Sequence, residues 1–235
     1  RACDVASGDK VLTNAYTLAP VPGAIRAVGA DAVLVEIDED LRLDLDDLDA
    51  KIASSGARVL LLSHMRGHLC DMDRLMAICD AAEVTVIEDC AHTMGAQWNG
   101  IRSGNFGKVA CFSTQTYKHM NSGEGGFLTT DDAAIAARAT ILSGSYMLYE
   151  RHGAGPDPEA FADARYDMPN CSARMDALRA AILRPQLADL DSNIARWNAR
   201  YAQVEERLKA QDGVATIKLP SAETHVGVPA GDIAV

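Results

Sequence analysis

The chain has 235 residues, 48% of them hydrophobic and 23% charged, with a formal net charge of −11. This length allows one well-buried domain, or one domain and part of a second. An acidic chain without a cluster of Lys or Arg has no attraction for phosphate backbones or anionic membranes, so we expect neither nucleic acid nor a membrane as partner. We also expect no signal peptide or membrane-spanning helix. Six cysteines without a Cys-x-x-Cys pair predict reduced thiols in a cytoplasmic protein.

Short apolar runs alternate with amphipathic stretches up to residue 142. The runs predict strands at 11–15, 32–37, 59–63, 84–88, 109–112 and 126–129. The stretches between them predict helices at 22–28, 45–53, 72–82 and 132–142, with Asp44 and Asp71 as N-terminal caps. Most of the runs are apolar almost throughout, which is typical of strands buried on both faces. Their alternation with helices predicts a three-layer α/β domain with a mainly parallel sheet.

Residues 173–210 carry apolar side chains at steps of three and four, the spacing of one helix face. Pro185 interrupts this pattern and is expected to kink or split the helix there, because proline lacks the backbone donor. A long kinked helix after an α/β domain indicates a connector. We therefore expect a large domain over 1–172, followed by a connector helix and the start of a small domain over 173–235.

Lys118 follows one of the predicted strands and precedes a loop that holds Gly123, Gly125 and Gly126. Taken alone, a lysine is most often a solvated surface charge. Glycines, however, permit positive φ and let the backbone approach a ligand closely. An amine that is desolvated in such a pocket is a nucleophile toward aldehydes. In this context Lys118 is predicted to form an imine with an aldehyde cofactor.

Asp89, Ser113 and His64 fall at the carboxyl ends of predicted strands, where parallel sheets bind ligands. As isolated residues, Asp89 would be a turn carboxylate, His92 a structural histidine and Ser113 a strand-end hydroxyl. Together with Lys118, Asp89 is predicted to face the ring nitrogen of a pyridine cofactor and keep it protonated, a contact worth roughly 1.5–3 kcal/mol. His92 would contact the ring face or its phenolic oxygen, and Ser113 would reach its phosphate.

Other site chemistries lack their residues. The sequence has no Gly-x-Gly-x-x-Gly after its first strand, no Walker loop and no Gly-x-Ser-x-Gly elbow, which argues against nucleotide-binding folds and serine hydrolases. His64 and His68 lie near Asp71 and Asp73 in the sequence. Their spacing suits no established metal site, so we predict none.

The order of these motifs resembles the DegT/StrS sugar-aminotransferase family, whose members are fold-type I pyridoxal phosphate (PLP) enzymes. The family's strand motif is similar to residues 87–92 with 95–96, and its lysine motif is similar to residues 112–126. An upstream motif of the family is similar to residues 64–67 and 70–72, and the start of its connector helix to residues 174–175, 180–181 and 186–187. The resemblance extends roughly over residues 5–210 and implies a fold-type I large domain leading into an incomplete small domain.

The resemblance implies the roles given above for Lys118, Asp89, His92 and Ser113. Family members also borrow an Asn from the neighbouring subunit to bind the phosphate, which implies a homodimer with shared active sites. Asn170 is the candidate here, although it stands four residues before the Arg of the connector motif instead of the usual two. The family's N-terminal phosphate-binding segment is expected to precede residue 1, so we expect these 235 residues alone to bind PLP weakly.

The activity that the resemblance implies is transfer of an amino group from glutamate or glutamine to a keto-sugar, which we expect to be linked to a nucleotide. Family members that dehydrate sugars replace the lysine with His, so Lys118 argues against dehydration. Amination of a keto-cyclitol and formation of an aromatic amine remain alternatives within the family. Outside it, the alternatives are a non-catalytic binding or regulatory protein with the same fold, and an inactive fragment.

Overall fold

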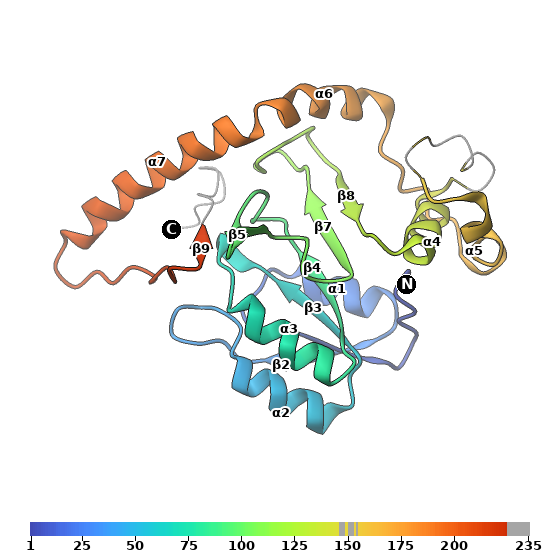
Figure 1. Ribbon diagram of the computed structural model, residues 1–235, viewed down its shortest axis with the longest axis horizontal. Coiled ribbons are helices and arrows are strands. Elements are labelled where there is room, and N and C mark those ends of the chain that lie inside the picture. Colours follow the sequence, from blue (N-terminus) through green and yellow to red (C-terminus); the bar gives the residue numbers. More distant parts are fainter. Residues whose placement is uncertain (146–148, 150–152, 154, 225–235) are drawn as a thin grey trace.

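A six-stranded sheet forms the centre of the protein (Figure 1). The structure is a computed structural model that describes residues 1–145, 149, 153 and 155–224. The strands lie in the order β2-β1-β3-β4-β7-β8, and all neighbours are parallel except β7 and β8. Their bounds are Lys10–Asn14 (β1), Asp31–Val35 (β2), Val59–Ser63 (β3), Thr85–Asp89 (β4), Val109–Ser113 (β7) and Gly126–Thr129 (β8). The six predicted strands are therefore confirmed, with ends displaced by one or two residues at most.

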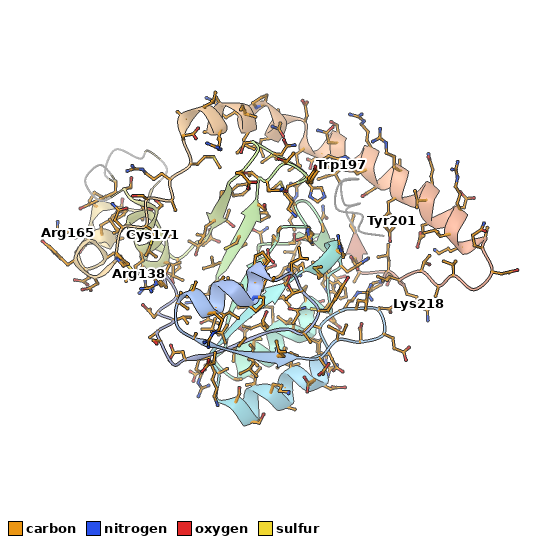
Figure 2. The ribbon with its side chains drawn as sticks, turned by 180° about the vertical axis from the view of Figure 1, so that it is seen from behind. Arg138, Arg165, Cys171, Trp197, Tyr201 and Lys218 are labelled. Carbon is orange, nitrogen blue, oxygen red and sulfur yellow. The ribbon has the colours of Figure 1, made fainter. Side chains whose placement is uncertain are left out.

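Helices cover both faces of this sheet, which confirms the three predicted layers. Helix α1 (Pro20–Ala27) lies on one face, and α2 (Leu45–Ser55) and α3 (Met72–Ala81) lie on the other (Figures 1 and 2). Side chains of β3 point alternately to the two faces of the sheet, which explains this arrangement. Val59 and Leu61 pack with Ile25 of α1, whereas Leu60 and Leu62 belong to the larger core beneath α2 and α3. Full burial of each such leucine contributes roughly 1.5–3 kcal/mol.

Both predicted helix caps are confirmed. The Asp44 carboxylate accepts hydrogen bonds from the backbone N–H groups of Asp46 and Asp47, and the Asp71 carboxylate accepts one from Arg74. Each cap satisfies donors that the first helical turn leaves unpaired, an effect worth about 1 kcal/mol. These caps set where α2 and α3 begin, and so the lengths of the turns that lead into them.

Strand β8 differs from the expectation that the strands are buried on both faces. All four of its residues are exposed, including Phe127 and Leu128. The reason is its position, because β8 lies at the edge of the sheet and, among the described residues, pairs with β7 alone. Helix α4 (Ala133–Ser143), which follows β8, packs with the short helices η3 (Pro158–Phe161) and α5 (Ala164–Asp167).

The predicted long helix over 173–210 is two helices, α6 (Ala177–Ala188) and α7 (Leu190–Lys209). The expected split at Pro185 is wrong, because α6 continues through Pro185 and the chain leaves helical geometry at Asp189, with φ −95° and ψ 1°. A kink of α6 at Pro185 stays a prediction. The two helices pass over the carboxyl end of β7 (Figure 1).

After α7 the chain returns to the body of the protein. Strand β9 (Glu223–Thr224) pairs with β5 (Gln97–Trp98), which pairs with β6 (Ile101–Arg102) in a small antiparallel sheet. The expected division into domains at residue 172 stays a prediction, and residues 225–235 of the second domain lie outside the described residues. In the described part of the chain, no helix combines the length and the apolar character needed to cross a membrane.

Candidate active site

Three strand ends bring the candidate site together. Ser63 ends β3 and pairs in register with Asp89, which ends β4, and the next strand, β7, ends at Ser113. Because carboxyl ends of parallel strands meet at one edge of the sheet, these polar side chains share that edge. The predicted placement of Asp89 and Ser113 at strand ends is therefore what the structure shows.

Asp89 is half-buried, and both of its oxygens are held. Oδ1 accepts a hydrogen bond of 3.1 Å from the backbone N–H of Ala91, and Oδ2 accepts one of 3.2 Å from the Ser63 hydroxyl. A carboxylate oxygen has two lone pairs, so each retains one further acceptor direction. The side chain is therefore fixed by two local donors and still able to accept a hydrogen bond from a ring N–H.

His92 is buried, and its ring is oriented by the backbone of Arg66. The Arg66 N–H donates a hydrogen bond of 3.3 Å to His92 Nδ1. Since a backbone N–H only donates, Nδ1 carries no proton, and the neutral ring has its proton on Nε2. Arg66 lies in the turn η1 (Met65–Gly67) with φ 58° and ψ 19°, a left-handed conformation that costs a non-glycine residue roughly 1–2 kcal/mol. This strain is localised at the residue that sets the tautomer of His92.

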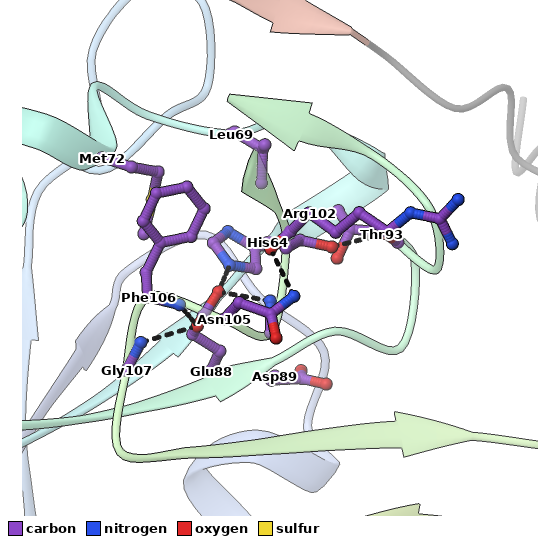
Figure 3. A network of polar contacts seen from close by, with 12 residues as sticks. His64, Leu69, Met72, Glu88, Asp89, Thr93, Arg102, Asn105, Phe106 and Gly107 are labelled. Carbon is purple, nitrogen blue, oxygen red and sulfur yellow. Dashed lines mark hydrogen bonds and ion pairs between the residues drawn. The ribbon is translucent and has the colours of Figure 1, made fainter. Parts of the chain in front are cut away.

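A buried carboxylate anchors the loops beneath the site (Figure 3). Glu88 Oε2 accepts hydrogen bonds from His64 Nε2 at 3.0 Å and from the Gly104 N–H at 2.9 Å. Oε1 accepts from the N–H groups of Phe106 and Gly107, at 2.9 and 2.8 Å. Burial alone would raise the pKa of Glu88, but His64 and the backbone donors stabilise the charged form more, so its pKa lies below the ordinary value. Glu88 thus ties the turn after β3 to the loop before β7.

The same group includes a possible ligand set for a metal, because atoms of His64, Glu88 and Cys90 lie within 4.8 Å of one another. Four hydrogen bonds already occupy the four lone pairs of the Glu88 carboxylate. Burial raises the pKa of the Cys90 thiol well above its ordinary value, which disfavours the thiolate that a metal binds. His64 and Glu88 are therefore a hydrogen-bonded anchor as they stand, and Cys90 is a buried thiol beside them.

Asp71 and Asp73, which lie near His64 and His68 in the sequence, have structural roles. Asp71 caps α3. Asp73 accepts hydrogen bonds from Trp98 Nε1 at 3.0 Å and from Asn99 Nδ2 at 2.6 Å. The proximity of these residues in the sequence therefore reflects helix capping and packing.

Lys118 lies half-buried in the lysine loop, residues 114–125, between β7 and β8. The ends of this loop are closed by backbone hydrogen bonds from Thr114 to Gly125 and from Ser122 to Thr114, both 2.9 Å long. Gly123 and Gly125 have φ of 89° and 132°, as the sequence predicted for this loop. A Cβ at Gly125 would come within 2.9 Å of Thr114 Oγ1, so this close approach requires glycine.

The helices α6 and α7 hold the lysine loop from above. The Gln186 side chain accepts a hydrogen bond of 2.9 Å from the Asn121 N–H and donates one of 2.7 Å to the Asn121 carbonyl oxygen. The rings of His119 and Trp197 meet edge to face with centroids 5.0 Å apart, and Figure 2 shows Trp197 on the side of α7 that faces the sheet. The segment after residue 176 therefore supports the candidate site directly.

The remaining predicted residues differ in their placement. Ser113 is half-buried, and its hydroxyl accepts a hydrogen bond of 3.3 Å from the Gln115 N–H beside the lysine loop. Asn170 is exposed between α5 and α6, and its Oδ1 accepts a hydrogen bond of 2.9 Å from the Ser172 N–H. Asn170 is thus not part of the cluster around Asp89 within one chain, and its predicted role toward a second subunit stays a prediction.

Sequence reasoning did not identify Asn14, Ser63 or Gln186 as parts of the site. Asn14 and Ser63 are polar residues that follow apolar residues at the ends of β1 and β3, which was the available signal, and the structure buries both. Gln186 belongs to the connector-helix motif noted in the sequence, but that motif does not indicate a contact with the lysine loop, because a glutamine on a helix is ordinarily solvated. Its partner on the lysine loop is 65 residues away in the sequence.

The groups at this edge fit pyridoxal phosphate by their chemistry. A primary amine, a carboxylate, an imidazole N–H and a strand-end hydroxyl match its aldehyde, ring nitrogen, phenolic oxygen and phosphate. This arrangement, a mainly parallel sheet between helix layers, is the fold of solved aminotransferase structures. The model of the DegT/DnrJ/EryC1/StrS aminotransferase family matches residues 1–229, and the chain belongs to this family.

Individual relatives agree with this assignment. The chain is 33% identical over 216 residues to L-glutamine:2-deoxy-scyllo-inosose aminotransferase of Micromonospora echinospora, covering 89% of this chain and 50% of that protein. It is 34% identical over 213 residues to dTDP-3-amino-3,6-dideoxy-alpha-D-galactopyranose transaminase of Aneurinibacillus thermoaerophilus, covering 89% and 54%. The crystal structure of S. venezuelae DesV in complex with a ketimine intermediate superposes with a TM-score of 0.81 at 29% identity, covering 96% of this chain and 58% of that one. The chain thus spans about half the length of the curated relatives it matches.

Proposed function

We propose that this chain is the cofactor-binding part of a PLP-dependent aminotransferase that moves an amino group from glutamate or glutamine to a keto-sugar. The observation that carries the proposal is the Asp89 carboxylate, fixed at a strand end with an acceptor direction to spare, in a chain of an aminotransferase family. The two relatives described above are named as aminotransferases for a keto-cyclitol and for a dTDP-linked sugar. We favour a nucleotide-linked keto-sugar as the acceptor and keep a keto-cyclitol as the alternative.

The proposed roles are those that the family resemblance implies, and the hydrogen bonds of Asp89 and His92 support them. Asp89 accepts the N–H of the cofactor ring and holds its proton there, while His92 donates from Nε2 to the phenolic oxygen. Ser113 binds the phosphate, and the Lys118 amine binds the aldehyde carbon and moves the substrate's α-proton. When bound, PLP supplies an electron-withdrawing ring that stabilises negative charge at the substrate carbon.

The proposed assembly is a homodimer in which Asn170 of each subunit completes the phosphate site of the other. The exposure of Asn170, away from the Asp89 cluster of its own chain, supports that role. A cytoplasmic location is proposed from the cysteines, because all six are free thiols and half of them are buried.

The test is the visible absorbance of PLP added to the natural protein that contains this chain. We expect a band that is lost in Lys118→Ala, kept in Lys108→Ala and bleached by glutamate or glutamine. Lys108 is a matched control because it precedes the same strand, β7, at its opposite end and is exposed. A protein without a lysine-dependent band contradicts the enzyme proposal, and a band unaffected by any amino donor favours a non-catalytic binding protein. Product analysis with a dTDP-linked keto-sugar and a keto-cyclitol then identifies the acceptor class.

A further inference from the structure

Ser63 lies beside Asp89 in the sheet, and its backbone is held by an unusual clamp. Backbone pairing between β1 and β3 ends at Thr13 and Leu61. Beyond that point the Asn14 side chain continues the pairing, because its Nδ2 donates to the Ser63 carbonyl oxygen at 3.1 Å and its Oδ1 accepts from the Ser63 N–H at 2.9 Å. Asn14 and Ser63 are 3% and 5% exposed, so both bonds are shielded from water. The end of β3 is therefore fixed in place relative to β1.

A chain of two hydroxyls leads from this fixed point to the carboxylate. Thr17 Oγ1 donates to Ser63 Oγ at 2.8 Å, and Ser63 Oγ donates to Asp89 Oδ2 at 3.2 Å. The direction is determined by the acceptor, since a carboxylate oxygen only accepts and each hydroxyl has a single proton to give. The proton of Ser63 is thus committed to Asp89, and Thr17 satisfies the oxygen of Ser63.

Asp89 is consequently restrained on both oxygens by elements of different strands. The Ala91 N–H comes from the turn after β4, whereas the Ser63 hydroxyl comes from β3. Two donors at two oxygens fix the rotation of the carboxylate about its last bond, which one donor alone does not. Charge-assisted bonds of this kind are stronger than neutral ones, so their loss is measurable.

We propose that Ser63 is a positioning residue for Asp89, with Asn14 fixing its backbone and Thr17 fixing its hydroxyl, so that the carboxylate points at the ring nitrogen of the cofactor. The inference rests on the function proposed above, because it assigns a purpose to the orientation of Asp89. It adds three polar residues, from β1, the turn after β1 and β3, to the predicted site residues of β4, the turn after β4, β7 and the lysine loop.

The first test compares PLP affinity by titration of the visible band or of protein fluorescence. Ser63→Ala and Thr17→Val are expected to weaken PLP binding, Ser63→Ala by about tenfold, because Asp89 loses a donor to a charged group. Thr17→Ser keeps the hydroxyl and is expected to restore the affinity of the wild type. Thr13→Val is the matched control, since Thr13 is buried on the same strand as Asn14 and its hydroxyl donates to the Leu61 carbonyl oxygen at 2.9 Å, away from Asp89. Equal affinities in Ser63→Ala, Thr17→Val and Thr13→Val overturn the inference while leaving the proposed function intact.

The second test needs no cofactor. In the cofactor-free protein, the shifts of the urea midpoint caused by Ser63→Ala and Asp89→Ala are expected to be smaller in combination than their sum, because both remove the hydrogen bond between Ser63 and Asp89. The shifts caused by Thr13→Val and Asp89→Ala are expected to add. Additive shifts for the first pair overturn the inference even if the protein binds PLP, and a failure of PLP binding leaves this measurement valid. If Ser63→Ala does not fold, Thr17→Val takes its place in both tests.

Discussion

Replacing Glu88 with Gln removes one negative charge from the anchor beneath the site and keeps the size of the side chain. The Glu88 carboxylate accepts four hydrogen bonds, two at each oxygen. In any orientation, the amide of glutamine places an NH₂ group against two of these donors. In the most favourable orientation the NH₂ group of the glutamine points toward His64. The His64 ring can change tautomer and accept a hydrogen bond from this NH₂ group, but the Gly104 N–H then loses its acceptor.

The magnitude follows from this count. One buried donor left unpaired costs about 1–3 kcal/mol, and the remaining bonds lose part of their charge assistance. We therefore expect Glu88→Gln to lower the free energy of unfolding by about 2–4 kcal/mol at pH 7. Glu83→Gln is the matched control, because Glu83 is an exposed residue on the same segment and the change in charge is identical. Its effect is expected to stay within about 0.5 kcal/mol.

The pH dependence gives a second criterion. A carboxyl group whose pKa is lower in the folded state adds stability above its unfolded value, here 4.5, and this stability is lost as the pH falls through the folded value. The difference between wild type and Glu88→Gln is thus expected to be largest at neutral pH and to shrink below about pH 4.5. Urea unfolding at several pH values, followed by circular dichroism, measures it. Equal stabilities of Glu88→Gln and Glu83→Gln, or a difference independent of pH, would refute the reasoning.

Three further predictions concern glycine, the connector helices and the thiols. Gly126→Ala is expected to destabilise the protein by at least about 1–3 kcal/mol in urea unfolding, because the new Cβ would lie 2.6 Å from a carbonyl oxygen of β7, whereas Gly23→Ala, in open space on α1, is expected to stabilise it slightly. Gln186→Leu removes two hydrogen bonds to Asn121 and is expected to increase amide hydrogen exchange in the lysine loop. Unchanged exchange would contradict the idea that Gln186 holds this loop. Burial raises the pKa of Cys79 to about 12, so a thiol reagent at pH 8 is expected to modify exposed Cys171 first, and equal rates would contradict this burial.

Local features of the fold were predictable from the sequence because their causes lie within a few residues. Apolar runs gave all six strands of the main sheet, and the carboxylates of Asp44 and Asp71 gave the starts of two helices. The positive φ angles of Gly123 and Gly125 followed from the glycines themselves. What the sequence could not predict was exposure at the edge of the sheet, because strand order depends on contacts between distant segments. The break at Asp189 in place of Pro185 likewise depends on how the two helices pack.

For the candidate site, the sequence by itself determined which chemistry is available. It placed Asp89 and Ser113 at strand ends and Lys118 in a glycine-rich loop, and the order of motifs indicated the family to which the chain belongs. Only the tertiary structure decided what orients these groups. The partners of Asp89 and of the lysine loop include Ser63, 26 residues away, and Gln186, 65 residues from its partner. Hydrogen bonds over such separations form only after the strands and connector helices have packed, so no local pattern of residues specifies them.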